Sequence, residues 1–288
     1  MISKKAFRNL FRRSIFYIWK KKISDFFFRY KYRQKTIKID VFGYGLSFST
    51  KSTYSKHAFL PKFLDGYVYE PPVSKLLIEQ LTDKKSFLDI GSNVGYFSML
   101  ANRVMENGKI QAFEMDPFLC NEFRTNSALN PSNNSIIIHN IGIGSKKGKL
   151  YGVASRAGHP LRFITPNKPS YKFPFNFGKS SIINIDAIDN LVNENVDVVK
   201  IDIEGAELEA LKGMVKLIES CKPKLFLEVH PRGVLRFGNT MNDITQFLKD
   251  YDYEIFEIST FKNNSSESEY KELVDLSSLK EATMLYCV

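Results

Sequence analysis

The stretch FLDIGSNVGYFS (Phe87–Ser98) is the part of the sequence that decides the fold. It begins as a short apolar strand, and two glycines, Gly91 and Gly95, follow four residues apart before the sequence turns amphipathic. In doubly wound α/β proteins, a strand that bends tightly into a helix forms the ligand site at the carboxyl end of the first strand. The spacing is close to the dinucleotide-binding pattern G-x-G-x-x-G, but the middle glycine is missing and an acid, Asp89, precedes the turn.

The acid before the turn indicates which cofactor would fit. Asp89 would repel the pyrophosphate of NAD and would attract an ammonium group. S-adenosylmethionine has an amino-acid end, a sulfonium and no phosphate, so it suits a turn of this kind. Gly91 would let the backbone pass close to the ligand, and Gly95 would let the helix start against the strand. The turn therefore favours an S-adenosylmethionine site over that of a nicotinamide oxidoreductase; a helix cap is the alternative role for Asp89.

The end of the next expected strand carries a second acid. In KIQAFEMDP, Glu114 lies 23 residues after Gly91. An acid about 20 residues beyond the glycine turn is where a ribose diol is held in doubly wound folds. We therefore expect Glu114 to bind the ribose of the cofactor, and the alternative is a solvated charge at a strand end.

Strands and helices alternate along most of the chain. Strands are expected at 86–90, 109–114, 135–139, 196–203 and 224–229, and helices at 71–83, 94–105, 118–129, 206–219 and 242–250. This alternation predicts a parallel sheet covered by helices on both faces. The closing stretches YEIFEIST and ATMLYCV would add an antiparallel strand to that sheet.

One stretch, ASRAGHPLRFITPNKPSYKFPFNFGKS (154–180), interrupts the alternation. It holds four prolines, four phenylalanines and no acid. A long irregular segment inside a compact domain is usually functional or disordered. We expect a loop that covers the substrate, and a plain surface insertion is the alternative.

The stretch VDVVKIDIEGAELEALKG (196–213) carries charges where a buried strand ends. Lys200, Asp202 and Glu204 occupy every second position and would share one face of that strand. Because charges are rare on a strand that is covered on both sides, Asp202 and Glu204 are candidates for an active-site edge beside the cofactor. The alternative is a structural Lys200–Asp202 pair with Glu204 as a helix cap.

The next strand, KLFLEVHP (224–231), ends with Glu228 and His230 at the same edge of the sheet. Methylation of a hydroxyl needs a base that takes the hydroxyl proton, and a histidine or a carboxylate within reach can do this. His230 is the candidate base, and a hydrogen bond at the strand end is its alternative role.

Taken together, these stretches resemble the FkbM family of S-adenosylmethionine-dependent methyltransferases. The resemblance covers about residues 69–230 and rests on FLDIGSNVGYFS, AFEMDP, the asparagine pair in NSALNP, INIDAIDNL, VDVVKIDIEGAELEALKG and FLEVHP. It implies an α/β fold of the class I (Rossmann-like) methyltransferase type, with a mainly parallel seven-stranded sheet and a C-terminal antiparallel strand. In the family, a proline usually follows the acid of the second strand directly; here Met115 and Asp116 come between, and Glu114 remains the residue expected at the ribose.

The resemblance also implies functional residues. The cofactor contacts carried over are Asp89, Gly91, Asn93, Gly95 and Glu114. Asn140, just past the third strand, is a further candidate for the adenine side. The active-site edge carried over is Asp202, Glu204 and His230. Similar proteins methylate hydroxyls on sugars and on natural-product scaffolds.

The cysteines and histidines have neither the spacing of a metal site nor that of a disulfide framework. They are Cys120, Cys221 and Cys287, and His57, His139, His159 and His230. An odd number of cysteines without paired spacing is typical of a reducing compartment. We therefore predict no metal and a cytoplasmic protein. A divalent metal held by Asp202, Glu204 and His230 is the alternative, and the spacing does not support it.

The net charge of +10 is concentrated in the first 40 residues. These hold thirteen Lys or Arg residues and two acids, so the rest of the chain is nearly neutral and predicts no nucleic-acid groove. The arm is aromatic, and its apolar run at 15–19 is too short for a signal peptide or a membrane span. Two roles stay open for it: residues 1–35 lie on an anionic membrane surface, or they pack on their own domain or on a second subunit of a homodimer.

The expected organisation is a basic, helical N-terminal extension at 1–40, lead-in strands and a loop at 41–75, and a methyltransferase domain at 76–288. The predicted activity is transfer of a methyl group from S-adenosylmethionine to a sugar hydroxyl in a glycan or glycolipid precursor. The alternatives are O-methylation of a small secondary metabolite or lipid, and a binding module that keeps the fold without turnover. The presence of Asp202, Glu204 and His230 together counts against such a module.

Overall fold

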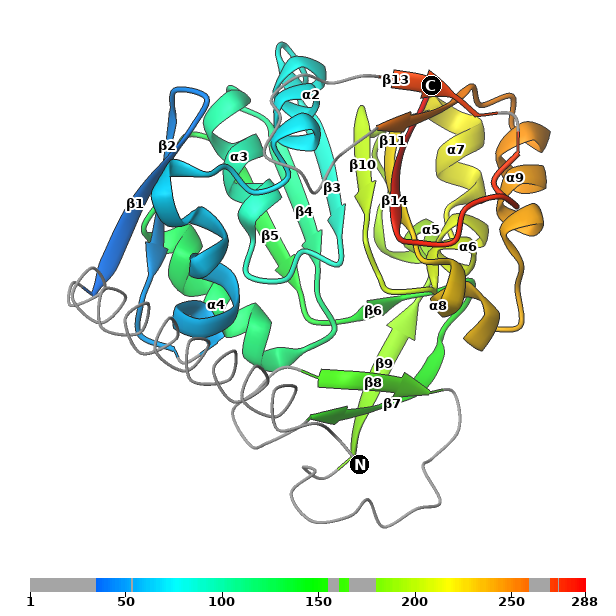
Figure 1. The fold of residues 1–288 in the computed structure, drawn as a ribbon, viewed down its shortest axis with the longest axis horizontal. Coiled ribbons are helices and arrows are strands. Elements are labelled where there is room, and N and C mark those ends of the chain that lie inside the picture. The colour runs from blue at the N-terminus through cyan, green and yellow to red at the C-terminus, as the bar shows by residue number, and fades with distance from the viewer. Residues whose placement is uncertain (1–34, 53, 155–160, 166–179, 259–269, 274) are drawn as a thin grey trace, which may run out of the picture.

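The computed structural model describes residues 35–52, 54–154, 161–165, 180–258, 270–273 and 275–288 (Figure 1). The basic extension predicted at 1–40 lies almost entirely outside the described residues, so its helical character stays a prediction. A membrane-crossing helix is absent from the part of the chain that the structure describes, because none there combines the required length with enough hydrophobicity.

A mostly parallel sheet forms the centre of the protein. Its strand order is β13-β12-β14-β11-β10-β3-β4-β5. The strands are β3 (Ser86–Ile90), β4 (Lys109–Phe113), β5 (Ser135–His139), β10 (Val198–Ile201), β11 (Lys224–Val229), β12 (Ile255–Ile258), β13 (Tyr270–Glu272) and β14 (Thr283–Cys287). β14 is antiparallel to both β11 and β12, which confirms the predicted antiparallel closing strand. The described residues give eight strands rather than the predicted seven, because the short β13 pairs with the outer edge of β12.

The order of the parallel strands reverses between β3 and β10, which are direct neighbours. The chain runs from β3 through β4 to β5 on one side of this point and returns to β10 and β11 on the other. In open α/β sheets, ligands bind outside the carboxyl ends of the strands at such a reversal. The fold therefore places the end of β3, at Ile90, beside the end of β10, at Ile201.

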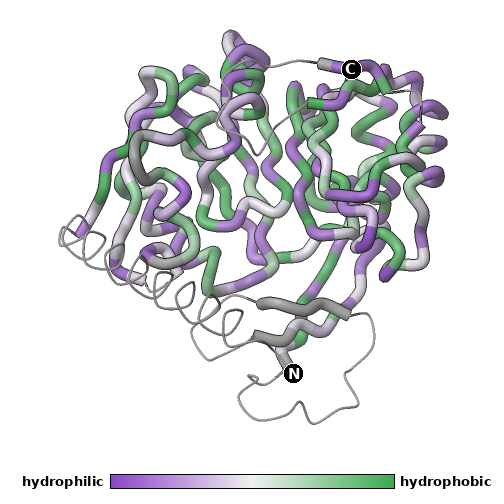
Figure 2. Tube along the Cα trace, in the orientation of Figure 1, coloured by the Kyte–Doolittle hydropathy of each residue, from purple (hydrophilic) through white to green (hydrophobic). Residues whose placement is uncertain are grey.

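Helices cover both faces of this sheet. They are α2 (Pro71–Leu81), α3 (Tyr96–Val104), α4 (Pro117–Ala128), α5 (Ile188–Leu191), α6 (Glu207–Lys212), α7 (Val215–Cys221), α8 (Pro231–Arg236) and α9 (Met241–Asp250). Because strand residues alternate between faces, Phe87 and Val198 join the core formed with α2, α3 and α4, whereas Leu88 and Val199 join the core formed with α6, α7 and α9. Figure 2 shows hydrophobic stretches along the inner strands of the sheet.

A second, smaller sheet lies beyond the carboxyl ends of the parallel strands (lower part of Figure 1). Its order is β6-β9-β7-β8, with β6 (Gly142–Ile143), β7 (Gly148–Ala154), β8 (Leu161–Thr165) and β9 (Ser180–Asp186). The sequence predicted no strands between 140 and 195, so β6, β7, β8 and β9 correct that prediction. Of the substrate loop expected at 154–180, residues 155–160 and 166–179 lie outside the described residues, and β8 is paired with β7.

The helix expected at 206–219 is broken into α6 and α7. A Cβ on Gly213 would lie 2.1 Å from the carbonyl oxygen of Gly144, so the backbones of these two segments touch. Only glycine leaves room for this contact, and Gly213 is the residue that ends α6. The strand expected at 196–203 is also shorter, ending at Ile201.

The lead-in segment belongs to the same packed body. It contains a hairpin of β1 (Thr36–Val41) and β2 (Tyr44–Ser49), a short π-helix (Ser55–Phe59) and a 3-10 helix (Leu60–Gly66). The backbone N–H groups of Ser47 and Ser49 donate to the side-chain oxygens of Asn130 and Asn126, each at 2.9 Å. The asparagine pair that the sequence singled out therefore fastens the hairpin to α4. Because the boundary expected at residue 40 falls inside β1, we propose that the hairpin is part of the methyltransferase domain.

Candidate active site

The turn between β3 and α3 lies directly against the backbone that follows β10. Gly91 has a φ of +83°, and a Cβ on it would lie 1.9 Å from the carbonyl oxygen of Asp202. The backbone N–H groups of Gly91 and Ser92 both donate to the carbonyl of Phe113, at 2.9 and 3.1 Å. Glycine is required at position 91 for two reasons, the left-handed backbone and the lack of space for any side chain.

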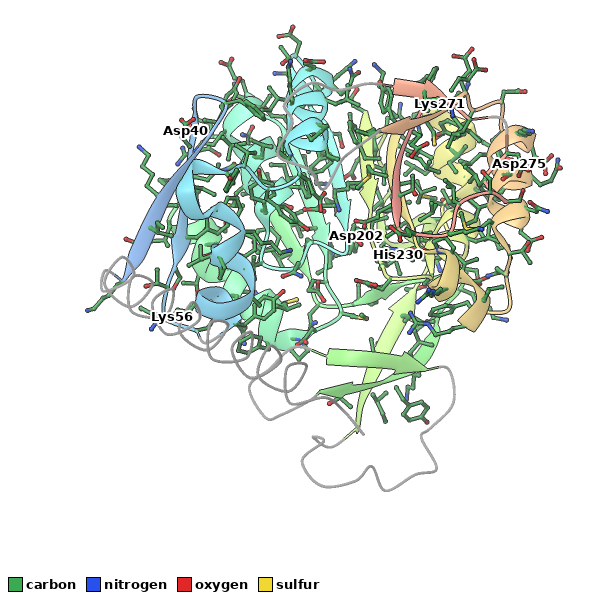
Figure 3. The ribbon with its side chains drawn as sticks, in the orientation of Figure 1. Asp40, Lys56, Asp202, His230, Lys271 and Asp275 are labelled. Carbon is green, nitrogen blue, oxygen red and sulfur yellow. The ribbon has the colours of Figure 1, made fainter. Side chains whose placement is uncertain are left out.

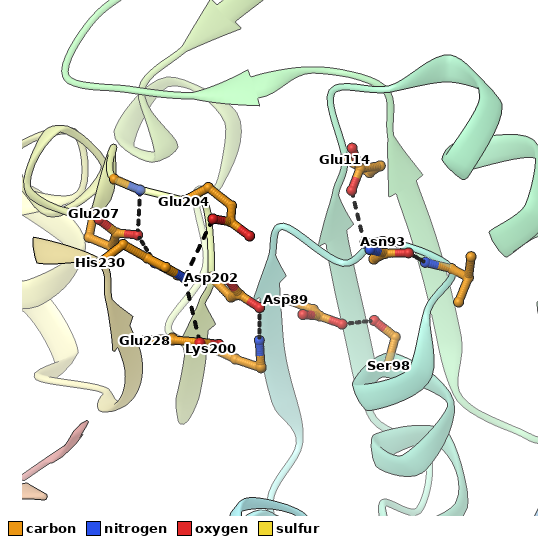
Figure 4. Close-up of polar contacts among 12 residues, drawn as sticks. Asp89, Asn93, Ser98, Glu114, Lys200, Asp202, Glu204, Glu207, Glu228 and His230 are labelled. Carbon is orange, nitrogen blue, oxygen red and sulfur yellow. Dashed lines mark hydrogen bonds and ion pairs between the residues drawn. The ribbon is translucent and has the colours of Figure 1, made fainter. Parts of the chain in front are cut away.

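Glu114 is held at the end of β4 by two backbone donors. Its Oε2 accepts a hydrogen bond from the N–H of Asn93 at 2.9 Å (Figure 4). Its Oε1 accepts one from the N–H of Asp116 at 2.8 Å. Burial raises the pKa of Glu114 to about 7, against the effect of these two donors. Asp116 itself caps α4, since its Oδ1 accepts from the N–H of Phe118.

These groups line a cavity of about 690 Å³, the first cavity. Such a volume falls in the range of about 300–1,000 Å³ that is usual for cofactor and small-molecule sites. Its polar lining includes Asn93, Glu114 and Asp202. Its apolar lining includes Ile90, Phe113, Leu119, Ile143, Leu150 and Ile185, so β6, β7 and β9 of the small sheet form part of its wall.

Three of the residues expected to contact the cofactor lie outside the lining of this cavity. Asp89 is 1% exposed, and its Oδ2 accepts from Ser98 Oγ at 2.5 Å, while its Oδ1 has no hydrogen-bond partner in the part of the chain that the structure describes. Gly95 begins α3 with a φ of +88° and packs against the ring of Phe123 of α4, so its close approach is to a helix rather than to the strand.

Asn140 is the third of these residues. Its amide nitrogen donates to the carbonyl oxygens of Glu114 and Met115, each at 3.0 Å. Both contacts hold the backbone that follows β4. The structure therefore gives Asn140 a supporting position behind Glu114, while its neighbours Ile141 and Gly142 reach the first cavity.

A second cavity, of about 660 Å³, adjoins the first. Asp202 and Glu204 line both cavities and thus form their common wall. The second cavity is further lined by Lys62, Val68, Tyr69, Glu70, Pro71, Glu228, His230 and Ala282. Four of its lining residues are carboxylates, which makes it a polar site suited to hydroxyl groups and other hydrogen-bond donors.

The imidazole of His230 is surrounded by carboxylates (Figures 3 and 4). Its Nε2 lies 3.5 Å from Glu228 Oε1, 3.7 Å from Glu204 Oε2 and 3.9 Å from Asp202 Oδ1. Its Nδ1 lies 2.9 Å from Glu207 Oε1. The sequence-predicted Asp202, Glu204 and His230 therefore do come together, although Glu204 differs from expectation: the strand ends before it, its φ is +57°, and its side chain is 77% exposed.

Lys200 is the buried cation of the group. Its Nζ lies 3.5 Å from Asp202 Oδ2 and 4.7 Å from the centre of the Phe97 ring, and Asp89 is its neighbour on β3. The pair of Lys200 and Asp202 that the sequence left open as a structural alternative is therefore formed. Burial raises the pKa of Asp202 to about 6, although the charge of Lys200 opposes this.

The pKa of His230 reflects its acidic surroundings. Burial alone would lower it, but hydrogen bonds to Glu207 and Glu228 and the charge of Asp202 raise it to about 10. The pKa is thus higher in the folded state than the ordinary value of 6.5. The protonated ring therefore stabilises the fold fully below that pH, and this contribution is lost as the pH rises towards 10.

Sequence reasoning gave no role to three acids of this site, although it placed Glu228 at the same edge as His230. Glu207 is fully buried, Glu228 is 4% exposed, and Glu70 is 4% exposed, with no hydrogen-bond partner for its Oε2 among the described residues. Glu228 had a usable signal, since it lies two residues before His230 and thus on the same strand face. Glu207 stands in the first turn of a helix, where an acid is ordinary, and Glu70 precedes two prolines, so neither position marks a site by itself.

Three of these groups have the donor types of a cation site. One carboxylate oxygen each of Asp202 and Glu228 and one ring nitrogen of His230 lie within 4.8 Å of one another. Lys200 already places a positive charge beside Asp202, and Glu207 binds the other ring nitrogen. The expectation that no metal takes part stays a prediction.

Comparisons with known proteins find methyltransferases. A family model described as the methyltransferase FkbM domain matches residues 89–255. The hexuronic acid methyltransferase AglP of Haloferax volcanii is 27% identical over 197 residues, which are 65% of this chain and 76% of AglP. The methyltransferase sdnD of Sordaria araneosa is 24% identical over 173 residues, which are 48% of this chain and 63% of sdnD.

Solved structures give more distant likenesses. A methyltransferase FkbM from Methylobacillus flagellatus is 19% identical, with a TM-score of 0.42, and the match covers 72% of this chain and 44% of that chain. The magnesium protoporphyrin IX methyltransferase of Synechocystis, with bound S-adenosylmethionine, is 11% identical, with a TM-score of 0.43, and the match covers 81% of this chain and 92% of that one.

Proposed function

This chain belongs to the FkbM family of methyltransferases and uses S-adenosylmethionine, and we propose that it methylates a hydroxyl group of a sugar in a glycan or glycolipid precursor. The observation that carries the proposal is the common wall of the two cavities. Asp202 and Glu204 line both, and His230 lies against both carboxylates. A donor in the first cavity and an acceptor in the second would meet at this wall.

The residues of the first cavity fit the cofactor. S-adenosylmethionine supplies a methyl group on a positively charged sulfur. Glu114 is fixed by two backbone donors and offers its remaining lone pairs to a ribose diol. Asp202 and Glu204 place negative charge at the wall where a sulfonium would be favoured.

His230 is the proposed base. Its Nε2 faces the common wall and would accept the hydroxyl proton of an acceptor in the second cavity, because proton removal makes the oxygen a better nucleophile. Asp202 and Glu228 would then share the positive charge of the ring. The carboxylates that line the second cavity would also accept hydrogen bonds from the other hydroxyls of a sugar.

A sugar acceptor is supported by the relative AglP, whose name states a hexuronic acid as its substrate. The test is to incubate the protein with S-adenosylmethionine and matched glycosides of neutral, amino and uronic acid sugars. The expected result is formation of S-adenosylhomocysteine together with a methyl ether, located by mass spectrometry and NMR. Methylation of a nitrogen, a carbon or a carboxylate instead would contradict the proposal.

Binding of the cofactor should depend on Glu114. Glu114→Ala is expected to weaken the affinity for S-adenosylmethionine by about 1–3 kcal/mol, because buried donors lose their partner. Calorimetry measures this, with NAD as the ligand that should not bind. Glu106→Ala, at an acid that lies before β4, is the matched control and should bind as the wild type does. Tight NAD binding without a response to S-adenosylmethionine would refute the cofactor assignment.

For the basic extension, we propose contact with an anionic membrane surface. Each base near such a surface contributes about 1 kcal/mol, and the effect fades with salt. Vesicles with anionic lipid should co-sediment the full-length protein and release it as salt rises. A variant with Lys20, Lys21 and Lys22 changed to Gln should bind more weakly. If the wild type ignores anionic vesicles, the alternative of packing on the domain or on a second subunit is favoured.

A further inference from the structure

Glu207 makes the shortest polar contact of the His230 ring. Its Oε1 lies 2.9 Å from His230 Nδ1, and the same oxygen accepts a hydrogen bond from the backbone N–H of Gly205 at 2.8 Å. The side chain is fully buried, and its Oε2 has no partner among the described residues. The oxygen that accepts from Gly205 is placed to accept from Nδ1 as well, so in the neutral ring Nδ1 carries the proton and Nε2 is left to face the common wall.

The backbone around this contact is tightly packed, which fixes its geometry. Gly205 has a φ of +121°, and a Cβ on it would lie 2.3 Å from the carbonyl carbon of Gly233 in α8. A Cβ on Gly233 would in turn lie 2.5 Å from the carbonyl oxygen of Glu204, and Arg236 donates to that oxygen at 2.9 Å. His230 directly precedes α8. These backbone contacts therefore fix the position of the turn before Glu207 relative to His230.

The other charged groups around the ring occupy a different position. Asp202 and Glu204 follow β10, Glu228 belongs to β11, and all three approach Nε2 at 3.5–3.9 Å. Glu207, from α6, is the group at Nδ1. Removal of its charge therefore affects the tautomer and basicity of the ring without changing the groups that line the cavities.

We propose that Glu207 is a positioning residue that orients His230 and keeps its Nδ1 protonated, so that Nε2 serves as the proton acceptor. This inference rests on the proposed function, in which His230 is the base. The methyl group would pass from the sulfonium sulfur to the acceptor oxygen, which leaves S-adenosylhomocysteine, while the hydroxyl proton would pass to Nε2. Glu207 would stabilise the resulting imidazolium. The proton then leaves to solvent, and the neutral ring is restored with the same tautomer.

The experiment is an NMR titration of isotope-labelled histidine in the full-length protein, with and without S-adenosylhomocysteine. The His230 signal is identified by its loss in His230→Asn. In the wild type we expect an Nδ1-protonated neutral form and an inflection far above the ordinary histidine range. Glu207→Gln should move the inflection down by about 1–3 pH units, because it removes one nearby opposite charge. Glu207→Asp keeps the charge and should restore much of the shift.

Glu209→Gln is the matched control, because Glu209 lies on the same helix but binds Ser145 and Asn239 instead of His230. It should leave the His230 inflection unchanged. An Nε2-protonated neutral ring in the wild type, or an equal inflection in wild type and Glu207→Gln, would overturn the inference. If Glu207→Gln does not fold, the wild-type spectrum decides, because an Nε2-protonated neutral ring would by itself overturn the inference. The titration needs no acceptor, so its outcome is separate from a failure to find a methylated sugar.

Discussion

Replacing His230 by Asn is expected to lower turnover about 10²–10⁴-fold while the affinity for S-adenosylhomocysteine stays nearly unchanged, because the variant loses the proton acceptor and not the cofactor cavity. Asn is preferred to Ala because its amide can still donate to the buried Glu207. In His230→Ala that carboxylate would keep only the backbone N–H of Gly205 as a donor, and breaking a buried charged pair costs about 3–5 kcal/mol of stability. Turnover is followed as release of S-adenosylhomocysteine, and binding by calorimetry.

The pH dependence is a second readout of the same prediction. Because the pKa of His230 is raised to about 10, the ring is protonated at neutral pH, and wild-type turnover should rise with pH towards that value. His230→Asn should lack this rise. Asp202→Asn should also reduce turnover, since Asp202 lies on the common wall. Parallel losses of cofactor affinity and turnover in both variants would instead favour a structural role for the group.

Gly91→Ala is expected to abolish measurable cofactor binding and to lower the free energy of unfolding by about 2–5 kcal/mol. The left-handed backbone of a residue with a side chain costs about 1–2 kcal/mol, and overpacking adds about 1–3 kcal/mol. The added methyl group would lie 1.9 Å from the carbonyl oxygen of Asp202, which is backbone and cannot rotate away. β3 and β10 would have to separate where the first cavity begins.

Gly43→Ala is the matched control for this substitution. Gly43 has a φ of +90°, close to that of Gly91, and a Cβ on it would have no atom within 4 Å. It should therefore show the backbone cost of about 1–2 kcal/mol alone, with normal cofactor affinity. Chemical denaturation measures both variants. Equal losses of stability in the two would mean that the turn after β3 can move away from Asp202, and the steric argument would fail.

The sequence alone determined the features that depend on neighbouring residues. Apolar runs such as Phe87–Ile90 and Leu225–Val229 were correctly predicted as strands, and their alternation with helices correctly predicted a mostly parallel sheet. The turn at Gly91 could be predicted because the glycines and the acid that indicate it are only a few residues apart. These features were also the ones that carried the resemblance to the FkbM family, which the family match confirmed.

Local patterns failed where the backbone responds to distant contacts. The helix expected at 206–219 is divided at Gly213, a residue whose backbone touches that of Gly144, 69 positions away in the chain. The small sheet of β6 to β9 was not predicted. Its strands do not follow the strand–helix alternation of the rest of the chain, and they form by pairing with one another. Glu204 turns away from the expected strand face because the strand ends at Ile201.

Only the tertiary structure decided which acid contacts Nδ1 of His230. Glu207 and His230 are 23 residues apart, and they meet because β10 and β11 are parallel neighbours whose carboxyl ends share one edge. Glu70 reaches the same cavity from a segment that precedes the main sheet altogether. An acid in the first turn of a helix has the same local sequence whether it faces solvent or a buried imidazole. The difference arises from burial, which removes water as the competing partner and leaves the imidazole as the donor that the carboxylate needs.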